Sequence, residues 1–532
     1  MARVLFLIAY VFIFSISSFS QVTGTSQWAA MMKGGEKLPA VYGVKGVPSA
    51  TNRPGSRRGA VSWTDTSGKF WMYGGYGYTA DTTKLRDLNC LWHYNVTTDQ
   101  WTWKSGSDTG SQKATFGTMG VPSINNTPAF HSNAQWIDAQ NNLWLLGSSV
   151  VMWKYSIATN EWTWVKGDTT SGVVFSNYGV KGMGTAATEP GNRSGTRSWV
   201  DPSGKFWLFG GSGNANSSGG NLNDLWKFDP ATLIWTWMAG DSTPNKSSTF
   251  GSKGFAAPAN TPGARYGSAS WADNNGNLWL FGGYGRAFFP AGGIYGNFYL
   301  SDFWKFSVAT NQWTWVSGDT TTGFNQFSVY NTKGTPNAST KPGIRGEPFC
   351  AIEPSGDFIM FGGWGSSSSE AVVMLNDLFR YSPATNLWTW LGGDITGTKL
   401  TSNATKPGVP HPDLKVGTRW DGLMWVDKYY NIYVFGGQGT SASSNSDSFF
   451  GDMWKLSGGP VYTFIGNGSW QTASNWRNNL IPPNPVPPGS HVVIDISGGS
   501  TCIYSGSITF SNGARLTVPS GAIINIANLI MQ

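Results

Sequence analysis

The sequence predicts an all-β fold in which six repeats of a four-stranded sheet form a ring, followed by a small C-terminal β module. Composition is the first observation: only 12% of the 532 residues are charged, whereas the chain holds 70 glycines and 29 tryptophans. Helical bundles need Ala, Glu, Lys and Leu, so this composition disfavours them and favours short strands joined by turns. The second observation is a motif that recurs six times, and the third is a partial copy of it at the N-terminus.

The N-terminal segment, residues 1–20, is typical of a signal peptide. Arg3 supplies a positive charge, residues 4–16 are almost entirely apolar, and small residues precede the bond before Gln21. The apolar stretch is shorter than the roughly 20 residues that a membrane-spanning helix needs. We therefore expect cleavage, and a mature protein that is secreted or held at the cell surface without spanning the membrane.

The repeats occupy residues 21–459. Each contains an apolar strand that ends in Gly-Gly or, in the second repeat, Gly-Ser: FWMYGG (70–75), LWLLGS (143–148), FWLFGG (206–211), LWLFGG (278–283), FIMFGG (358–363) and IYVFGG (432–437). A shorter strand with an acidic turn precedes it, and an aromatic third strand and a fourth strand with Trp-Thr-Trp follow it. Aromatic and β-branched residues suit half-buried strands. Each repeat is therefore predicted to be a four-stranded antiparallel meander.

The N-terminus is predicted to complete the last repeat. Five Trp-Thr-Trp strands exist for six repeats, because the sixth repeat breaks off after DMWKLSGG (452–459). At the other end of the mature chain, SQWAAMMKGG (26–35) aligns with NQWTWVSGD (311–319). An N-terminal strand that joins the last sheet closes the ring and leaves no exposed sheet edge.

These motifs, over residues 26–457, resemble the kelch family of β-propellers, which belongs with the galactose-oxidase-like propellers. That family's repeat has an aliphatic strand ending in Gly-Gly, a variable loop, an Asp before an aromatic strand, and a Trp-bearing fourth strand. The resemblance implies a six-bladed kelch-type β-propeller closed by the N-terminal strand. It does not settle function, because the same propeller hosts both binding modules and oxidases.

The oxidases of this superfamily hold copper with two histidines and two tyrosines, one of them cross-linked to a cysteine. The chain has only four histidines, which are scattered along it: His93, His131, His411 and His491. Copper favours clustered imidazoles. We therefore expect no copper, no other metal and no cofactor, and the sequence leaves open whether the protein is an enzyme at all.

The long, variable loops are expected on one face of the ring, because the other two loops of each meander are short and stereotyped. Variable loops on a rigid scaffold are where ligand sites are usually built. The residues that we single out on this face are Tyr76, Tyr78, Tyr284, Arg286, Phe288, Phe289, Tyr295 and Trp364. Exposed rings beside polar groups suit a sugar or a peptide. The alternative is that these rings only pack each loop onto its neighbour.

An arginine begins the first strand of five repeats: Arg57, Arg193, Arg265, Arg345 and Arg419. The first strand of a blade is innermost, so these side chains are expected to ring the channel mouth. There they could hold carboxylates or acidic sugars through forked hydrogen bonds. The alternative is that each guanidinium ties adjacent blades together through backbone carbonyls.

Residues 460–532 form the C-terminal module, with proline-rich punctuation followed by alternating strands. This segment resembles the β-solenoid segments found at the ends of secreted bacterial surface proteins.

The net charge of +7 is spread along the chain without a run of like charges, so nucleic acid is not an expected partner.

The expected function is a secreted or cell-surface binding or adhesion module that recognises a glycan or a protein through the long-loop face. The acidic turns recur in every repeat, which favours a structural role for them and leaves no recognisable catalytic cluster. Two alternatives stay open: a carbohydrate-active oxidase of the galactose-oxidase-like fold, and a structural component of the cell envelope.

Overall fold

The computed structural model describes residues 27–531, apart from 33–34, 130–131, 170–171, 322–325, 398–401, 403–409, 412–413, 442–446, 460, 478–480, 488–489, 497–499, 512–513 and 519–521. The predicted signal peptide, residues 1–20, lies outside the described residues. Within the described part the protein is all-β, with three short 3₁₀ turns at Ser148–Val150, Pro290–Gly292 and Ala473–Asn475.

Six antiparallel meanders make up the larger part of the described chain, and we number them as sheets one to six. Sheet one is β3 (Val61–Thr64), β4 (Phe70–Tyr73), β7 (Leu91–Asn95) and β8 (Gln100–Ser105). Sheet two is β9 (Ser132–Ile137), β10 (Asn142–Gly147), β11 (Met152–Ser156) and β12 (Glu161–Lys166). Sheet three is β14 (Arg197–Val200), β15 (Phe206–Asn214), β16 (Gly219–Asp229) and β17 (Ile234–Ala239), and β13 (Arg193–Ser194) also pairs with β15.

The other three meanders follow the same plan. Sheet four is β20 (Ala269–Ala272), β21 (Leu278–Phe281), β24 (Phe303–Ser307) and β25 (Gln312–Ser317), with β18 (Ala256–Ala257) on its outer edge. Sheet five is β27 (Phe349–Ile352), β28 (Phe358–Gly365), β29 (Val373–Ser382) and β30 (Leu387–Gly392), with β26 (Arg345–Gly346) on β28. Sheet six is β32 (Leu423–Val426), β33 (Ile432–Phe435), β36 (Met453–Leu456) and β1 (Trp28–Ala30).

The first strand of the described chain belongs to the last sheet. β1 pairs antiparallel with β36, and Trp28 lies opposite Leu456 while Ala30 lies opposite Trp454. The strand predicted from the N-terminal copy of the motif is therefore present, in the place that the missing fourth strand of the sixth repeat would take.

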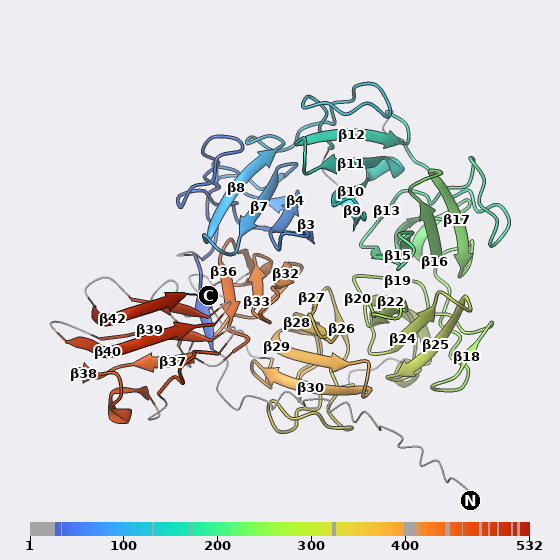
Figure 1. The fold of residues 1–532 in the computed structure, drawn as a ribbon. Coiled ribbons are helices and arrows are strands. Elements are labelled where there is room, and N and C mark those ends of the chain that lie inside the picture. The colour runs from blue at the N-terminus through green and yellow to red at the C-terminus, as the bar shows by residue number, and fades with distance from the viewer. Residues whose placement is uncertain are drawn as a thin grey trace, which may run out of the picture.

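The six sheets are arranged around a common centre (Figure 1). Their innermost strands contact one another in the order β3, β9, β14, β20, β27, β32 and back to β3. A separate apolar cluster fills the space between each pair of neighbouring sheets, including sheets six and one. Tryptophans dominate these clusters: Trp136 of sheet two stacks on Phe206 of sheet three at 5.3 Å, and Trp271 of sheet four stacks on Phe358 of sheet five at 5.1 Å. Burying such large rings is the main source of stability between sheets.

The acidic turns between the first two strands of each sheet are structural. Oδ1 of Asp65 accepts hydrogen bonds from the backbone N–H groups of Ser67 and Lys69, and Oδ2 accepts one from Nε1 of Trp71 (2.7 Å). Asp201 makes the same contacts with Ser203, Lys205 and Trp207. Each carboxylate thus holds a tight turn and a core tryptophan together, as a turn-forming aspartate does.

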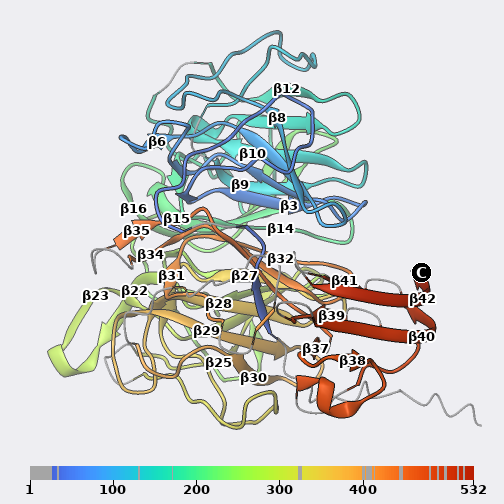
Figure 2. The same cartoon turned by 90° about the vertical axis from the view of Figure 1, so that its left-hand side faces the viewer.

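Short antiparallel extensions stand on one face of the ring. They are β2 (Arg57–Arg58), β5 (Tyr76–Gly77) and β6 (Arg86–Asp87) at sheet one, β19 (Arg265–Tyr266), β22 (Tyr284–Phe289) and β23 (Ile294–Tyr299) at sheet four, and β31 (Arg419–Trp420), β34 (Gln438–Thr440) and β35 (Asp447–Phe449) at sheet six. In Figure 2 the strands β6, β23 and β35 lie on one side of the ring, which we call the hairpin face.

The C-terminal segment differs from the ring because its strands pair in parallel. One three-stranded sheet is β37 (Val461–Phe464), β39 (His491–Ile494) and β41 (Arg515–Thr517), and the other is β38 (Gly468–Ser469), β40 (Thr501–Phe510) and β42 (Ile523–Met531). The two sheets together enclose one apolar core around Trp470, Trp476 and Phe510, separate from the cores of the ring. The module lies on the side of the ring opposite the hairpin face (Figure 2). An ion pair between Arg515 of the module and Asp99 of sheet one, 3.3 Å long, joins the two parts.

Candidate functional site

The five arginines predicted at the channel mouth are buried inside the sheets, between 0% and 4% exposed. Four form ion pairs, at 2.6–2.7 Å, with an aspartate that lies in the third strand of their own sheet or directly before it: Arg193 with Asp224, Arg265 with Asp302, Arg345 with Asp377 and Arg419 with Asp452. Arg57 instead donates to Sγ of Cys90 at 3.3 Å. Because these guanidiniums are enclosed and already bonded, they do not face the channel or offer themselves to a ligand carboxylate.

Each of these arginines also donates to a backbone carbonyl at the end of the Gly-Gly strand of its own sheet. Nη1 of Arg57 reaches the carbonyl oxygen of Gly74 (2.9 Å), and Nη1 of Arg193 reaches that of Gly210 (3.2 Å). The bonds lie within one repeat, so the guanidiniums hold their own sheet together rather than tying adjacent sheets to each other.

The aromatic residues predicted on the fourth repeat lie along the hairpin β22–β23. Phe288 packs against Tyr295 (5.0 Å between ring centroids), and Phe289 packs against Phe298 (5.4 Å). Arg286 lies 6.0 Å from the ring of Tyr295, whose side chain is 58% exposed. Cross-strand aromatic pairs stiffen a hairpin, so this one presents rings and a cation on a fixed scaffold.

The other predicted aromatics are spread over different sheets. Tyr76 and Tyr78 both contact Phe449 of β35, and Tyr78 is buried. Trp364 is half-buried on β28, opposite Met374. At the base of the fourth repeat's hairpin, Tyr284 packs between Tyr266 and Tyr299.

A cavity of about 630 Å³ lies at the centre of the ring, at the base of the hairpins, and we call it the central cavity. All six sheets or their extensions contribute to its wall, with Arg58, Gln135, Arg197, Tyr266, Glu347 and Asp421 among the lining residues. Tyr76, one of the eight residues predicted on the long-loop face, also lines this cavity. The cavity, which opens to solvent, therefore brings together two arginines, two carboxylates and aromatic rings.

The two carboxylates occupy a backbone position that is glycine in other repeats. The position lies two residues after each buried arginine, and its φ is +64° at Gly59, +65° at Gly195 and +68° at Gly267. Glu347 and Asp421 stand at the same place with φ of +51° and +56°. A side chain in this left-handed region is strained, and such strain is concentrated at functional sites.

Backbone hydrogen bonds link these positions from sheet to sheet. The N–H of Gly267 donates to the carbonyl of Gly195 (3.0 Å), and the N–H of Glu347 donates to that of Gly267 (2.6 Å). In the same way, the N–H of Asp421 donates to the carbonyl of Glu347, and the N–H of Gly59 donates to the carbonyl of Asp421, each at 3.0 Å. The backbone that carries both carboxylates is therefore fixed on either side, which pre-organises the acids at the wall of the cavity.

The pKa of Asp421 is raised to about 7, chiefly by burial and also by the neighbouring Glu347, while the guanidiniums of Arg58 and Arg197 act in the opposite sense. Burial also raises the pKa of Glu347, while Arg197 and Arg58 lower it. Nη1 of Arg58 lies 3.5 Å from Oδ2 of Asp421, and the guanidinium stacks on the ring of Trp420 at 4.5 Å. The four charges thus interact in one half-buried site, where electrostatic effects are stronger than in bulk water.

Sequence reasoning missed Arg58, Arg197, Glu347 and Asp421, the four charged groups of the cavity. It selected the arginine that begins the first strand, whereas the exposed positions of that strand come one to four residues later. A signal was present: the alignment of repeats places glycine at this position in three of them and an acid in two.

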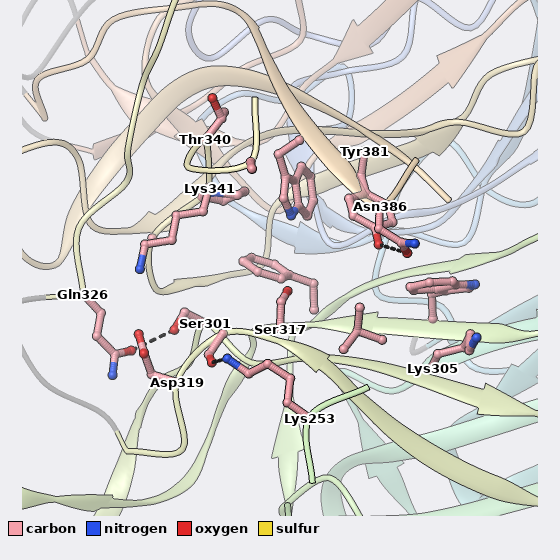
Figure 3. Close-up of a pocket in the computed structure, with 18 of the residues that line it drawn as sticks. Lys253, Ser301, Lys305, Ser317, Asp319, Gln326, Thr340, Lys341, Tyr381 and Asn386 are labelled. Carbon is pink, nitrogen blue, oxygen red and sulfur yellow. Dashed lines mark hydrogen bonds between the residues drawn. The ribbon is translucent and has the colours of Figure 1, made fainter. Parts of the chain in front are cut away.

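A second hollow, of about 560 Å³, lies between sheets four and five (Figure 3). Lys253 donates to the carbonyl of Gly318 (3.4 Å) and lies over the ring of Trp315 (4.4 Å). Lys45 and Lys181 make the same two kinds of contact in other repeats. The basic side chains of this groove are thus largely repeated packing contacts, and the central cavity is the stronger candidate for a ligand site.

The described residues hold no group of three or more His, Cys, Asp and Glu side chains that could bind a metal ion. His93 packs edge-on against Trp71 (4.9 Å), His491 is buried in the C-terminal module, and His131 lies outside the described residues.

No helix in the described part of the chain has the length and apolar character required to cross a bilayer. Neither the protein-family models nor the curated proteins compared with this chain match it.

Proposed function

We propose that the chain is a six-bladed kelch-type β-propeller, closed by its N-terminal strand and extended by a β-solenoid module. In this proposal it is exported and acts, secreted or at the cell surface, as a binding module for a glycan or a surface protein. The observation that carries the proposal is that the aromatic hairpin β22–β23 stands on the hairpin face, and that residues of the short extensions on this face, Arg58, Tyr76 and Tyr266, line the charged central cavity. Rigid aromatic rings beside polar groups are the usual elements of a carbohydrate or peptide site.

Within this proposal the hairpin β22–β23 supplies the contact surface. Tyr295 and Ile294 are exposed at its end, and the ring pairs Phe288–Tyr295 and Phe289–Phe298 hold the two strands together. A ligand ring stacking on Tyr295 would also meet the guanidinium of Arg286, which lies beside it. Such a pairing suits a sugar, whose faces stack on aromatic rings and whose hydroxyls accept hydrogen bonds from arginine.

A glycan array and a pull-down with the mature chain, residues 21–532, test this function. We expect saturable binding that Tyr295→Ala lowers at least tenfold. Tyr430→Ala, which removes an exposed ring from a turn between the first two strands of sheet six, is the matched control and should leave binding unchanged. Equal binding by both variants would remove the hairpin from the site. The absence of any saturable ligand would favour the structural envelope component instead.

A carbohydrate oxidase remains the catalytic alternative. Elemental analysis of the purified chain, together with oxidase assays on galactose in the presence and absence of added copper, distinguishes it from a binding module. Stoichiometric copper with sugar-dependent peroxide release would replace the binding proposal by the oxidase.

A further inference from the structure

We propose that the central cavity binds a small zwitterion, a ligand that carries both an ammonium group and a carboxylate. Glu347 would receive the ammonium group and Arg197 the carboxylate. This inference deepens the proposed binding function and rests on it, because it names the chemical class of a ligand for the hairpin face.

The cationic side of the cavity has hydrogen-bond donors to spare. Nε and Nη1 of Arg197 donate to the backbone carbonyls of Ser268 and Thr196, which fix the plane of the guanidinium. A guanidinium has five N–H donors in a planar fork. These two bonds leave Nη2 of Arg197 available to a ligand carboxylate, whereas Arg58 is already held by Asp421 and Trp420.

The anionic side is Glu347. Its backbone is fixed by the hydrogen bonds to Gly267 and Asp421, and its side chain runs beside Gly267. A Cβ at Gly267 would lie 2.7 Å from Cγ of Glu347, so the glycine makes the room that this side chain occupies. No described side chain donates a hydrogen bond to its carboxylate, and Arg197 acts on it only through its charge. Glu347 is half-buried, so a carboxylate that no side chain hydrogen-bonds is incompletely satisfied there, and a ligand ammonium would supply a partner.

The balance of charges selects the ligand class. A simple anion would be repelled by Glu347 and Asp421, and a simple cation would be repelled by Arg58 and Arg197. An uncharged sugar could hydrogen-bond to Glu347 and Arg197 through its hydroxyls, but it would bring no opposite charge to either of them. A molecule with one charge of each sign pairs with both, and a cavity of about 630 Å³ lies within the usual range for small-molecule sites.

The test is isothermal titration of the mature chain with three kinds of zwitterion: free α-amino acids, glycylglycine, and muramic acid, an amino sugar with a carboxylate. Each is compared with an analogue that lacks one charge, namely the N-acetyl form and the amide. We expect saturable binding of at least one zwitterion and at least tenfold weaker binding of both analogues. The three arms distinguish an amino acid, a peptide and a sugar as the source of the shared chemistry.

Two variants test the assigned ends. Glu347→Gln should weaken the zwitterion at least tenfold while leaving the carboxylate-only analogue unaffected, and Arg197→Gln should spare the ammonium-only analogue. If Glu347→Gln does not fold, Glu347→Gly provides the residue that other repeats carry at this backbone position. Equal binding of singly charged analogues, or no saturable zwitterion, would overturn the inference.

These outcomes are separable from those of the proposed function. A positive glycan array that depends on Tyr295, together with no zwitterion binding, would reject the cavity ligand alone. Zwitterion binding that requires Glu347, with no dependence of any glycan or protein ligand on Tyr295, would reject the hairpin surface alone.

Discussion

Sheets one and three share one backbone plan but treat the same buried arginine differently. In sheet three, Asp224 accepts two hydrogen bonds from Arg193 (2.7 and 3.0 Å), one from Nε1 of Trp226 and one from the hydroxyl of Tyr178 (both 2.8 Å). In sheet one the corresponding residue is Cys90, which receives Nη1 of Arg57 at 3.3 Å and the hydroxyl of Tyr42 at 4.0 Å.

The exchange of carboxylate for thiol leaves donors unsatisfied. Nη2 of Arg57 and Nε1 of Trp92, among the described residues of sheet one, are buried without a hydrogen-bond partner. Arg57 nevertheless keeps its bonds to the carbonyls of Gly55 (3.0 Å) and Gly74 (2.9 Å). The comparison shows that the backbone carbonyls are the common anchor of the buried arginine. The aspartate adds a counter-charge and satisfies the neighbouring rings.

The largest effect is expected from placing the residue of sheet one in sheet three. Asp224→Cys leaves Arg193 without its carboxylate, and breaking a buried ion pair from one side typically costs about 3–5 kcal/mol. Chemical denaturation followed by tryptophan fluorescence measures the change, with Asp229→Asn, at a half-buried position of the same strand, as the control. A loss below about 1 kcal/mol would mean that the thiol serves as well as the carboxylate, and the contrast between the sheets would disappear.

The second prediction compares equivalent lysines. Lys227 of sheet three is half-buried, whereas Lys455 of sheet six is 3% exposed beneath the C-terminal module. The pKa of Lys455 is lowered to about 7, chiefly by burial and also by Arg515, while Asp427 and Asp99 oppose this. Above that pH the unfolded chain binds a proton that the folded chain releases, so stability rises with pH towards the ordinary lysine pKa of about 10.4.

The slope contributed by Lys455 approaches about 1.4 kcal/mol per pH unit between the two pKa values. Lys455→Met should remove this slope, and Lys227→Met should retain it, when unfolding free energies are measured at pH 7, 8 and 9. The same slope in both variants would assign the pH dependence to other groups.

A smaller gain is expected from the reverse exchange in sheet one. Cys90→Asp offers acceptors to Arg57 and Trp92, and each buried donor so satisfied is worth about 1 kcal/mol. The melting temperature of the protein should rise, whereas Cys90→Ser, a control of similar size, should not raise it. A fall with Cys90→Asp would show that the pocket of sheet one has adapted to the larger sulfur.

The smallest effect concerns the left-handed position of the cavity wall. Glu347→Gly places at this site the residue that Gly59 and Gly195 represent in sheets one and three, and relief of φ strain stabilises by about 1 kcal/mol. The control, Glu370→Gly on an exposed loop of the same sheet, should bring no such gain. Stability that rises while zwitterion binding is lost would show that the acid is retained for binding.

Much of the architecture could be predicted because its determinants are local. The apolar runs that precede Gly-Gly and the Trp-Thr-Trp segments recur along the chain, and they lie in strands of the six sheets. The N-terminal copy of the motif correctly predicted that β1 would pair with β36, because a missing edge strand has one obvious substitute.

The site was harder to predict because its geometry is set between repeats. The partner of Arg193 is Asp224, a pairing that only the folded meander creates. The predicted aromatics of the hairpin could be named from one loop, whereas the central cavity draws single residues such as Arg58 and Glu347 from separate repeats. A residue that recurs in every repeat could be assigned one role from the alignment. Glu347 and Asp421, which replace the glycine of other repeats, could not be assigned a role in this way.

The pairing of β1 with β36 also governs the order in which the chain can fold. Sheets one to five each draw their strands from a continuous stretch, so they can form as soon as that stretch is available. Sheet six needs Trp28 and Leu456 together, and closing so long a loop is entropically slow. The N-terminal strand, which is synthesised first, would therefore be among the last to find its partner. Until then an edge of sheet six stays open, so that molecules that bind exposed β-strand edges would act on the folding chain and not on the folded protein.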